Sequence, residues 1–251
     1  MMLNDKLSKL LLAGLLTTTL AISGCASSST NTAETTKVTN NAGAVSAVAE
    51  EDGSQEVFDV INRSRAHVKR SGEVYSMRGL LNIFSRGMDV MAKKLRTRGY
   101  DAISYNHGNW RPVAEDIVKR ARQKKVNYPI VILGHSLGGN EASSMANYLG
   151  SKGIKVSFVA TFDPTESRSV GKNIGKVVNY YLPNGRNTIS KRSSFKGKLN
   201  NIDVTNITDI KHTNVEKNPG LQNKTFKTIK SITKPLSKRA KKKLFGTSSK
   251  T

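Results

Sequence analysis

The feature that most constrains the fold is an apolar run that ends in a glycine-rich turn and leads directly into a helical pattern. Residues 128–134 form a continuous apolar stretch of strand length, as expected for a buried strand of a parallel sheet. The sequence GHSLGG follows at residues 134–139, and apolar residues then recur at helical spacing over residues 142–149. So tight a turn from strand to helix has room only for glycine two positions before and after Ser136. The segment therefore predicts a strand–turn–helix unit of an α/β protein.

Further strand and helix patterns alternate along the middle of the chain. This alternation predicts an α/β fold with a mostly parallel central sheet and helices on both faces. We expect the folded domain to span residues 57–232. The predicted strands are 73–81, 102–105, 128–134, 155–162, 176–182 and 201–205, and the predicted helices are 88–95, 112–121, 142–149 and 225–232.

The turn at residues 134–138 has the G-x-S-x-G spacing of a nucleophile elbow. Ser136 would sit on the tight turn with its hydroxyl directed into the cleft at the end of the sheet. The Leu137 amide would lie at the start of the following helix, where N–H groups have no partner and point toward developing negative charge. We therefore predict Ser136 as a nucleophile and the Leu137 amide as an oxyanion donor.

A serine nucleophile of this kind needs a histidine base that follows it in the chain. Three of the four histidines fail this requirement: His67 and His107 precede Ser136, and His135 adjoins it but points the other way along the turn. His212 alone lies downstream, which makes it the predicted base.

The acid that orients the histidine should come between Ser136 and His212 in the chain. Asp163 directly follows the strand ending at Phe162, so its carboxylate is expected at the carboxyl end of a parallel strand, where α/β sheets build their sites. Asp203, near the end of a short strand, is the alternative. The remaining carboxylates in this interval are Glu141, Glu166 and Asp209.

A second oxyanion donor is expected from the loop after the first core strand. Gly79 in that loop would let the backbone approach the site closely, and the amide of Leu80 is the predicted donor.

The elbow, the Phe162-Asp163-Pro164 step and the late histidine together resemble the α/β-hydrolase superfamily, in particular its small lipase, esterase and thioesterase branches. The resemblance covers residues 73–232. It implies transfer of an acyl group from an ester or thioester through an acyl-serine, with no cofactor and no metal. Arg78 departs from the histidine that many lipases carry before the loop glycine, which puts the oxyanion geometry in doubt but not the triad.

The amino terminus has the pattern of a secretion signal. Lys6 and Lys9 precede an apolar run at residues 10–16, which is short for a membrane span. Residues 20–25, LAISGC, resemble a bacterial lipobox and end in the chain's one cysteine, Cys25. The resemblance implies a signal peptide over residues 1–24, a lipidated Cys25, and a flexible tether over residues 25–56. The predicted location is the bacterial cell envelope, on the outer membrane facing the periplasm; an ordinary signal peptide is the alternative.

The charge balance is strongly basic. The chain has 41 Lys and Arg residues against 18 Asp and Glu residues, a formal net charge of +23. Such a field attracts anionic partners. Residues 165–175 and 183–200 are predicted as basic loops beside the cleft that draw an anionic or membrane-surface substrate, and residues 233–251 as a disordered basic tail lying on anionic lipid. Few aromatic residues interrupt the basic runs, so no specific nucleic-acid binding is expected.

Two other functions remain compatible with these residues. One is a catalytically inactive lipoprotein that uses a hydrolase fold to bind anionic envelope components, since a fold does not fix a function. The other is an amidase or peptidase that uses the same triad.

Overall fold

The computed structural model describes residues 53–80 and 85–246. The predicted signal peptide, Cys25 and nearly all of the predicted tether lie outside the described residues. No helix in the described part is long and apolar enough to cross a membrane.

A six-stranded parallel sheet forms the centre of the fold, in the order β2-β1-β3-β4-β6-β8. Because β1 lies between β2 and β3, the strand order reverses there, and such a switch point opens a crevice beyond the carboxyl ends of the strands. The strands are β1 (Glu73–Arg78), β2 (Asp101–Asn106), β3 (Ile130–His135), β4 (Val156–Phe162), β6 (Ile174–Tyr181) and β8 (Lys198–Asp203).

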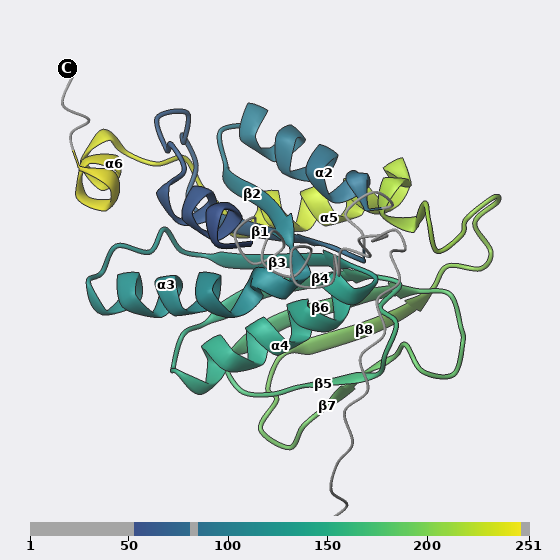
Figure 1. The fold of residues 1–251 in the computed structure, drawn as a ribbon. Coiled ribbons are helices and arrows are strands. Elements are labelled where there is room, and N and C mark those ends of the chain that lie inside the picture. The colour runs from purple at the N-terminus through teal and green to yellow at the C-terminus, as the bar shows by residue number, and fades with distance from the viewer. Residues whose placement is uncertain (1–52, 81–84, 247–251) are drawn as a thin grey trace, which may run out of the picture. The chain divides into compact units, whose positions relative to one another are not determined.

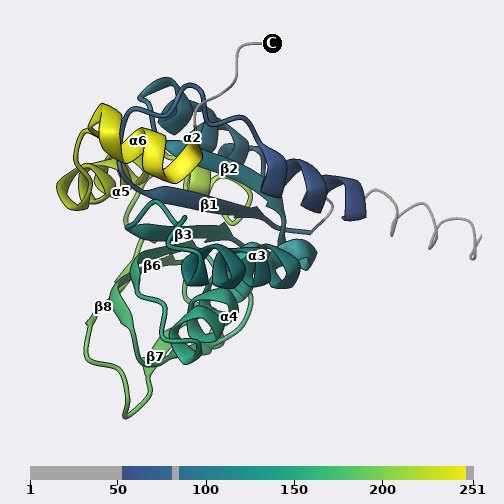
Figure 2. The same ribbon diagram turned by 90° about the vertical axis from the view of Figure 1, so that its left-hand side faces the viewer.

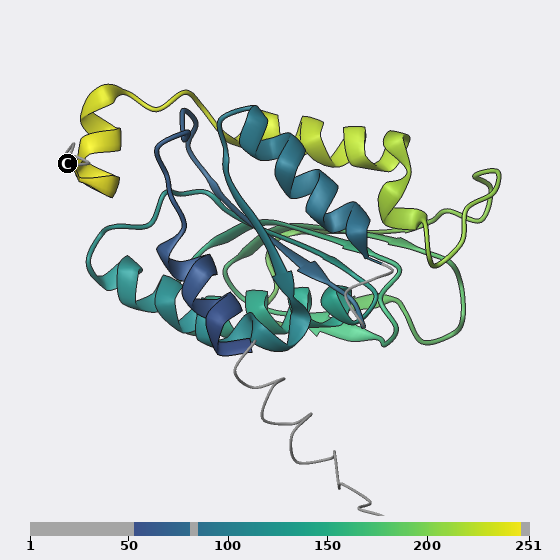
Figure 3. The ribbon, with the colours of Figure 1, turned by 45° about the horizontal axis from the view of Figure 1, so that its top comes forward.

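Helices cover both faces of this sheet (Figures 1 and 3). Helices α2 (Arg86–Thr97) and α5 (Pro219–Ile232) pack on one face, and α3 (Trp110–Arg122) and α4 (Leu137–Ser151) pack on the other. A further helix over residues 53–62 contributes Val60 to the core on the α3–α4 side. The predicted fold class is therefore confirmed.

Each face of the sheet has its own hydrophobic core, because every strand is covered on both sides. On the α2–α5 face, Met88 and Leu95 pack with Phe226 over the strands. On the other face, Ile117 and Met145 pack over Ile132. Each large side chain buried in this way contributes about 1.5–3 kcal/mol to folding.

The two segments predicted as basic loops are partly ordered into strands. Strand β5 (Arg168–Val170) and strand β7 (Ile189–Lys191) form a separate parallel pair. Buried Val170 and Ile189 fix the inner side of this pair. Asparagine side chains then satisfy its backbone: Asn147 binds Ser169 and Gly171, and Asn201 binds Ile189. The prediction of two plain loops was wrong because these partners are distant in the chain.

The carboxyl terminus is ordered further than its composition predicts. Residues 69–71 bind residues 234–236 through backbone hydrogen bonds, and Arg70 forms an isolated antiparallel bridge with Pro235. Helix α6 (Lys238–Phe245) then begins at Ser237, whose hydroxyl caps it by accepting from the Ala240 amide. In Figures 1 and 2, α6 lies beside the chain that leads into β1. The predicted disorder from residue 233 is therefore wrong as far as residue 245, and the predicted domain end at residue 232 is too early.

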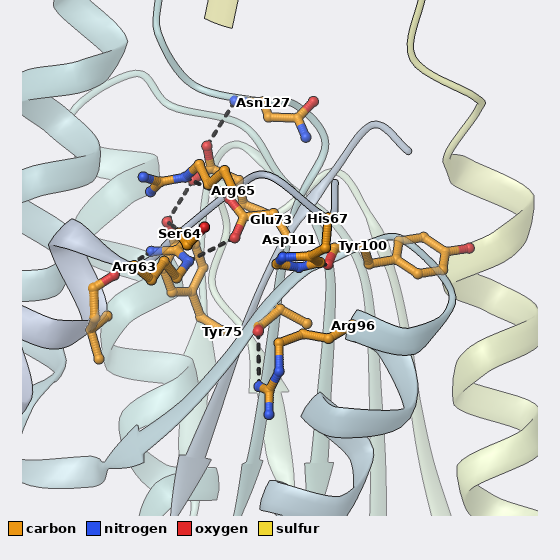
Figure 4. Close-up of polar contacts among 12 residues, drawn as sticks. Arg63, Ser64, Arg65, His67, Glu73, Tyr75, Arg96, Tyr100, Asp101 and Asn127 are labelled. Carbon is orange, nitrogen blue, oxygen red and sulfur yellow. Dashed lines mark hydrogen bonds and ion pairs between the residues drawn. The ribbon is translucent and has the colours of Figure 1, made fainter. Parts of the chain in front are cut away.

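Two buried carboxylates, Glu73 and Asp101, lie at the amino ends of β1 and β2, and each pairs with arginine; Figure 4 shows the arginines around Asp101. Asp101 accepts hydrogen bonds from Arg63 at 2.6 Å and from Arg65 at 3.0 Å. Burial opposes ionisation of Asp101, but the two guanidinium groups hold its pKa below the ordinary value. Glu73, fully buried, accepts from Arg120 at 2.8 Å and from the Asn127 amide at 2.8 Å.

We expect Arg120→Met to lower the free energy of unfolding by about 3–5 kcal/mol, because it leaves the Glu73 carboxylate buried without its cation. Urea denaturation measures the loss. The double variant Arg120→Met/Glu73→Gln should lose clearly less, since no charge is then stranded. Equal losses in the single and double variants would contradict this account. Arg111→Met, at an exposed pair with Glu115, should change stability by no more than about 1 kcal/mol.

Candidate active site

The turn between β3 and α4 holds Ser136 in a strained backbone conformation. Ser136 has φ 57° and ψ −125°, a region that side chains other than glycine rarely occupy. A Cβ on Gly134 would lie 2.0 Å from the Gly138 carbonyl oxygen, and a Cβ on Gly138 would lie 2.4 Å from the Met77 carbonyl oxygen. Both glycines are therefore required by backbone contacts, for the reason predicted from the sequence.

The three side chains predicted as a triad lie within hydrogen-bond distance of one another. His212 Nε2 is 3.0 Å from Ser136 Oγ, and His212 Nδ1 is 2.7 Å from Asp163 Oδ2. Asp163 lies immediately beyond β4, at φ 46°, and is almost fully buried. Its hydrogen bond and negative charge raise the pKa of His212 above the ordinary value of 6.5.

The second oxygen of Asp163 is held by groups that the sequence analysis did not identify. Asp163 Oδ1 accepts from the Leu182 amide at 2.9 Å and from Asn187 Nδ2 at 2.8 Å. Asn187 is itself buried, and its backbone carbonyl oxygen accepts from the Asn179 side-chain amide in β6. The carboxylate is thus fixed at both oxygens, which directs Oδ2 at the imidazole. An asparagine in an irregular segment gives no sequence signal for this role.

His135, the residue before Ser136, hydrogen-bonds to both Ser85 and the backbone of His212. Its ring is buried and binds Ser85 Oγ at 2.8 Å through Nδ1 and the His212 carbonyl oxygen at 2.7 Å through Nε2. Burial lowers the pKa of His135 to about 4, so the ring is neutral at pH 7. Nε2 must then carry the hydrogen, since a carbonyl can only accept, and Nδ1 accepts from the Ser85 hydroxyl.

The predicted oxyanion donors, the amides of Leu137 and Leu80, belong to two different segments of the chain. Leu137 opens α4, where the first helical amides have no carbonyl partner within the helix. Gly79 comes so close that a Cβ there would lie 2.9 Å from Ser136 Cβ. The Gly79 amide donates to Ser85 Oγ at 2.8 Å, so that amide is already engaged. Leu80 is the next residue, with an exposed side chain. Its amide stays a prediction.

The carboxylates not chosen as the acid have other contacts. Asp203, the alternative, is exposed, and its Oδ1 accepts from the amide and hydroxyl of Thr205. Glu166 and Glu141 both face Arg168, at 2.9 Å and 3.7 Å. Arg168 is therefore paired, which weakens the prediction that the segment around it attracts an anionic substrate.

The other histidines lie outside this arrangement. His67 Nε2 is 3.1 Å from the Tyr100 carbonyl oxygen at the opposite edge of the sheet. His107 begins a short 3-10 helix after β2. Across residues 53–80 and 85–246, no group of three or more His, Cys, Asp and Glu side chains is placed to hold a metal ion.

A buried carboxylic acid, Glu216, lies behind the base and was also missed by the sequence analysis. Its oxygens lie 3.7 Å from His135 Nε2 and 3.9 Å from Lys217 Nζ, too far for hydrogen bonds. A Cβ on Gly87 would lie 2.6 Å from Glu216 Cγ, so α2 packs directly on this side chain. Burial raises the pKa of Glu216 to about 7.

A parallel sheet with a strained serine after its third strand defines the α/β-hydrolase class. The sequence matches the family model of lipase (class 3) over residues 48–182, which is more than half of the chain. The protein therefore belongs to the class 3 lipase family. That family and fold support a lipase- or esterase-like enzyme that hydrolyses esters.

Two solved structures illustrate the similarity of this chain to known folds. An α/β-superfamily hydrolase from Xanthomonas campestris pv. campestris is 12% identical with a TM-score of 0.40, covering 64% of this chain and 99% of its own. A structure from work on LipS and LipT, two metagenome-derived lipolytic enzymes, is 10% identical with a TM-score of 0.41, covering 65% of this chain and 95% of its own. No curated protein sequence matches the chain.

We expect Glu216→Gln to become more stabilising, relative to the natural chain, as the pH rises. The folded-state pKa of Glu216, about 7, exceeds the ordinary value of 4.5. Between these two pH values the carboxyl is protonated in the folded state and ionised in the unfolded state, so the natural chain loses stability as the pH rises from 4.5 to about 7. The stability difference between variant and natural chain should grow by about 2–3 kcal/mol from pH 5 to pH 8. Denaturation at both pH values measures it. A pH-independent difference would contradict the buried acid, and exposed Glu166→Gln is the control.

Proposed function

We propose that this protein is a serine hydrolase that cleaves carboxylic ester or thioester bonds through an acyl-serine intermediate. One observation carries the proposal: the continuous hydrogen-bond chain from Asp163 through His212 to Ser136, with its 2.7 Å and 3.0 Å links. This arrangement provides a nucleophile, a base beside it, and a group that orients the base.

In the proposed mechanism, Ser136 Oγ attacks the acyl carbon while His212 Nε2 takes the hydroxyl proton. The amides of Leu137 and Leu80 stabilise the oxyanion that forms. His212 then gives its proton to the leaving alcohol or thiol, and the acyl group stays on Ser136. A water molecule, deprotonated by His212, attacks the acyl-serine and releases the acid. Asp163 holds the imidazole and stabilises its protonated form throughout.

The preference for esters over amides rests on the class 3 lipase family, since the same triad could cleave either bond. The chain-length preference of the acyl group is a property of the cleft beyond Ser136, and a panel of esters of increasing length measures it.

We expect Ser136→Ala to abolish hydrolysis of a short p-nitrophenyl ester, and a fluorophosphonate to label the natural protein at Ser136. Ser144→Ala, on the same helix but away from the triad, should keep full activity. Because His212 must be neutral to act as base and Asp163 raises its pKa, kcat/KM should rise with pH through a value above about 6.5. Labelling at another residue, or turnover that survives in Ser136→Ala, would refute the mechanism.

We also propose that the enzyme is anchored in the bacterial cell envelope, on the outer membrane facing the periplasm, by acylation of Cys25. The support is the sequence alone: a basic start, a short apolar run, and the chain's one cysteine at the end of a lipobox-like segment. About thirty residues separate that cysteine from the predicted start of the domain at residue 57, and a span of this length is enough for a tether.

Cys25→Ser should release the protein from the membrane fraction and abolish incorporation of radiolabelled palmitate. Ser28→Ala, three residues later, is the matched control and should leave both unchanged. Palmitate incorporation that persists in Cys25→Ser would exclude this anchor.

A further inference from the structure

Cations gather at the edge of the sheet where the parallel strands begin, opposite the edge that carries Ser136. We call this the amino edge and define it by the residues that line three neighbouring grooves there. Its cations are Arg63, Arg65, Arg70, Arg98, Arg120, Lys125, Lys155, Lys227, Lys230, Lys234 and Lys241. Within the described ranges, no carboxylate lines any of the three grooves.

The carboxylates that do occur near this edge are buried and already paired. Asp101 is held by Arg63 and Arg65, and Glu73 by Arg120, as Figure 4 shows for the Asp101 cluster. Both carboxylates are fully buried, so neither offsets the positive surface directly in solvent. Exposed carboxylates such as Glu166, Asp203 and Asp209 instead follow strand ends at the catalytic edge. The domain therefore has a positive edge and a mixed edge.

One of the three grooves lies between the end of α2 and the last turns of α5, with a volume of about 450 Å³. Exposed Arg98, Lys227 and Lys230 stand at its sides, and no carboxylate of the described chain lies within ion-pair distance of these three. Its floor is apolar and is formed by Leu95, Tyr100 and Phe226. Cations at the rim of a groove with an apolar floor suit a lipid molecule, whose anionic head group contacts the cations and whose apolar part contacts the floor.

The aromatic rings of this groove are not open for stacking with bases. The Arg98 guanidinium lies 4.8 Å from the Phe226 ring centroid, and the Arg70 guanidinium lies 5.2 Å from that of Tyr100. Binding of single-stranded nucleic acid relies on free aromatic faces, so this surface does not favour it.

Apolar groups interleave with the cations elsewhere along the amino edge. Tyr128 and Ile232 are exposed beside the groove that contains Lys155 and Lys234. Helix α6 is basic along its length and ends in Leu244 and Phe245, and Lys241 of this helix binds the Ala66 carbonyl at 2.7 Å. Leu244 and Phe245 are half-buried, and the Arg65 guanidinium lies 5.9 Å from the Phe245 ring centroid, so α6 adds four exposed or half-exposed lysines and one exposed arginine to the amino edge without a free apolar face.

We propose that the amino edge is a docking surface for an anionic lipid bilayer, and that the groove between α2 and α5 receives a phosphate-bearing head group. Docking in this way places Ser136, at the opposite edge, away from the docked bilayer. The proposal does not depend on the hydrolase chemistry.

The test measures vesicle binding by the full chain carrying Cys25→Ser, so that no acyl group on the cysteine contributes. The reversal variant is Arg98→Glu/Lys227→Glu/Lys230→Glu. The matched control, Arg86→Glu/Arg111→Glu/Arg186→Glu, makes the same change in charge with exposed arginines near the catalytic edge. Cosedimentation is compared for phosphatidylglycerol-containing and pure phosphatidylcholine vesicles.

Each cation close to an anionic membrane strengthens binding about fivefold, so loss of three cations alone weakens binding about 100-fold. The reversal variant also adds three negative charges, so it should bind anionic vesicles at least about 100-fold more weakly, and the control should lose much less. Binding to anionic vesicles should fall with added salt, and pure phosphatidylcholine should bind weakly. Bound vesicles should protect Lys227 and Lys230 from acetylation and leave Lys211 and Lys217 reactive, a readout that needs no enzyme activity.

Equal weakening by the two triple variants would show that net charge alone acts and would overturn the proposal. Equal binding to both vesicle types, or protection of Lys211 and Lys217 in place of Lys227 and Lys230, would also overturn it. Failure of both vesicle types to bind while duplex DNA does, with loss in the reversal variant, would assign the edge to a nucleic acid instead.

Discussion

A chain of hydrogen bonds through buried His135 connects the two loops that meet at Ser136. It runs from the Gly79 amide to Ser85 Oγ, from Ser85 to His135 Nδ1, and from His135 Nε2 to the carbonyl of His212. Every link is 2.7–2.8 Å long. Gly79 and Ser85, the turn that carries Ser136, and the segment around His212 are thereby connected to one another. These donors and acceptors fit only the neutral tautomer of His135 that carries its hydrogen on Nε2. Burial favours the neutral ring because it lowers the pKa of His135.

The backbone contacts of the nucleophile turn act together with this chain. Gly138 lies against the Met77 carbonyl at the end of β1, so the start of α4 is pressed onto the switch point of the sheet. The strained conformation of Ser136 persists because the surrounding backbone leaves no alternative. Asp163 is also at positive φ; its amide donates to the Tyr180 carbonyl, and its Oδ1 accepts from the Leu182 amide and Asn187. Ser136, Asp163 and His212 are thus each held by neighbouring groups outside the proposed triad.

The residues that could be predicted from the sequence are those whose position follows from local pattern. Ser136 and Asp163 directly follow apolar strands, and parallel strands bring their ends to one edge; His212 followed from its order in the chain. The supporting groups could not be predicted in this way. Asn187 lies in an irregular segment, Ser85 directly precedes α2, and Glu216 lies in a short 3-10 helix over Val215–Lys217. Their partners are set by packing between distant segments. His135 shows the limit clearly: its bond partner His212 is 77 residues away.

The carboxyl-terminal segment and the β5–β7 pair were misjudged for the same reason. Composition alone indicates disorder after residue 233, because the segment is basic and has few apolar residues. The backbone of residues 234–236 nevertheless finds partners at residues 69–71, more than 160 positions earlier. Ser237 is a favourable helix N-cap residue, but one N-cap residue does not by itself predict a stable helix. Helix α6 follows a segment that is anchored to residues 69–71. Local sequence patterns indicate single helices and strands. Whether these two segments are ordered depends on pairing with distant residues, which no local pattern encodes.

Burial shifts the pKa values of two groups near His212, the His135 imidazole and the Glu216 carboxyl, in opposite directions. Burial disfavours charge, so it lowers the pKa of His135 to about 4 and raises that of Glu216 to about 7. The His135 and His212 rings lie 5.0 Å apart, and a charged His135 would make protonation of His212 harder. Because His135 stays neutral, the effect of Asp163 on His212 is not cancelled. The imidazole can then take a proton from Ser136 and hold it as an ion beside Asp163, which is what a base in acyl transfer must do.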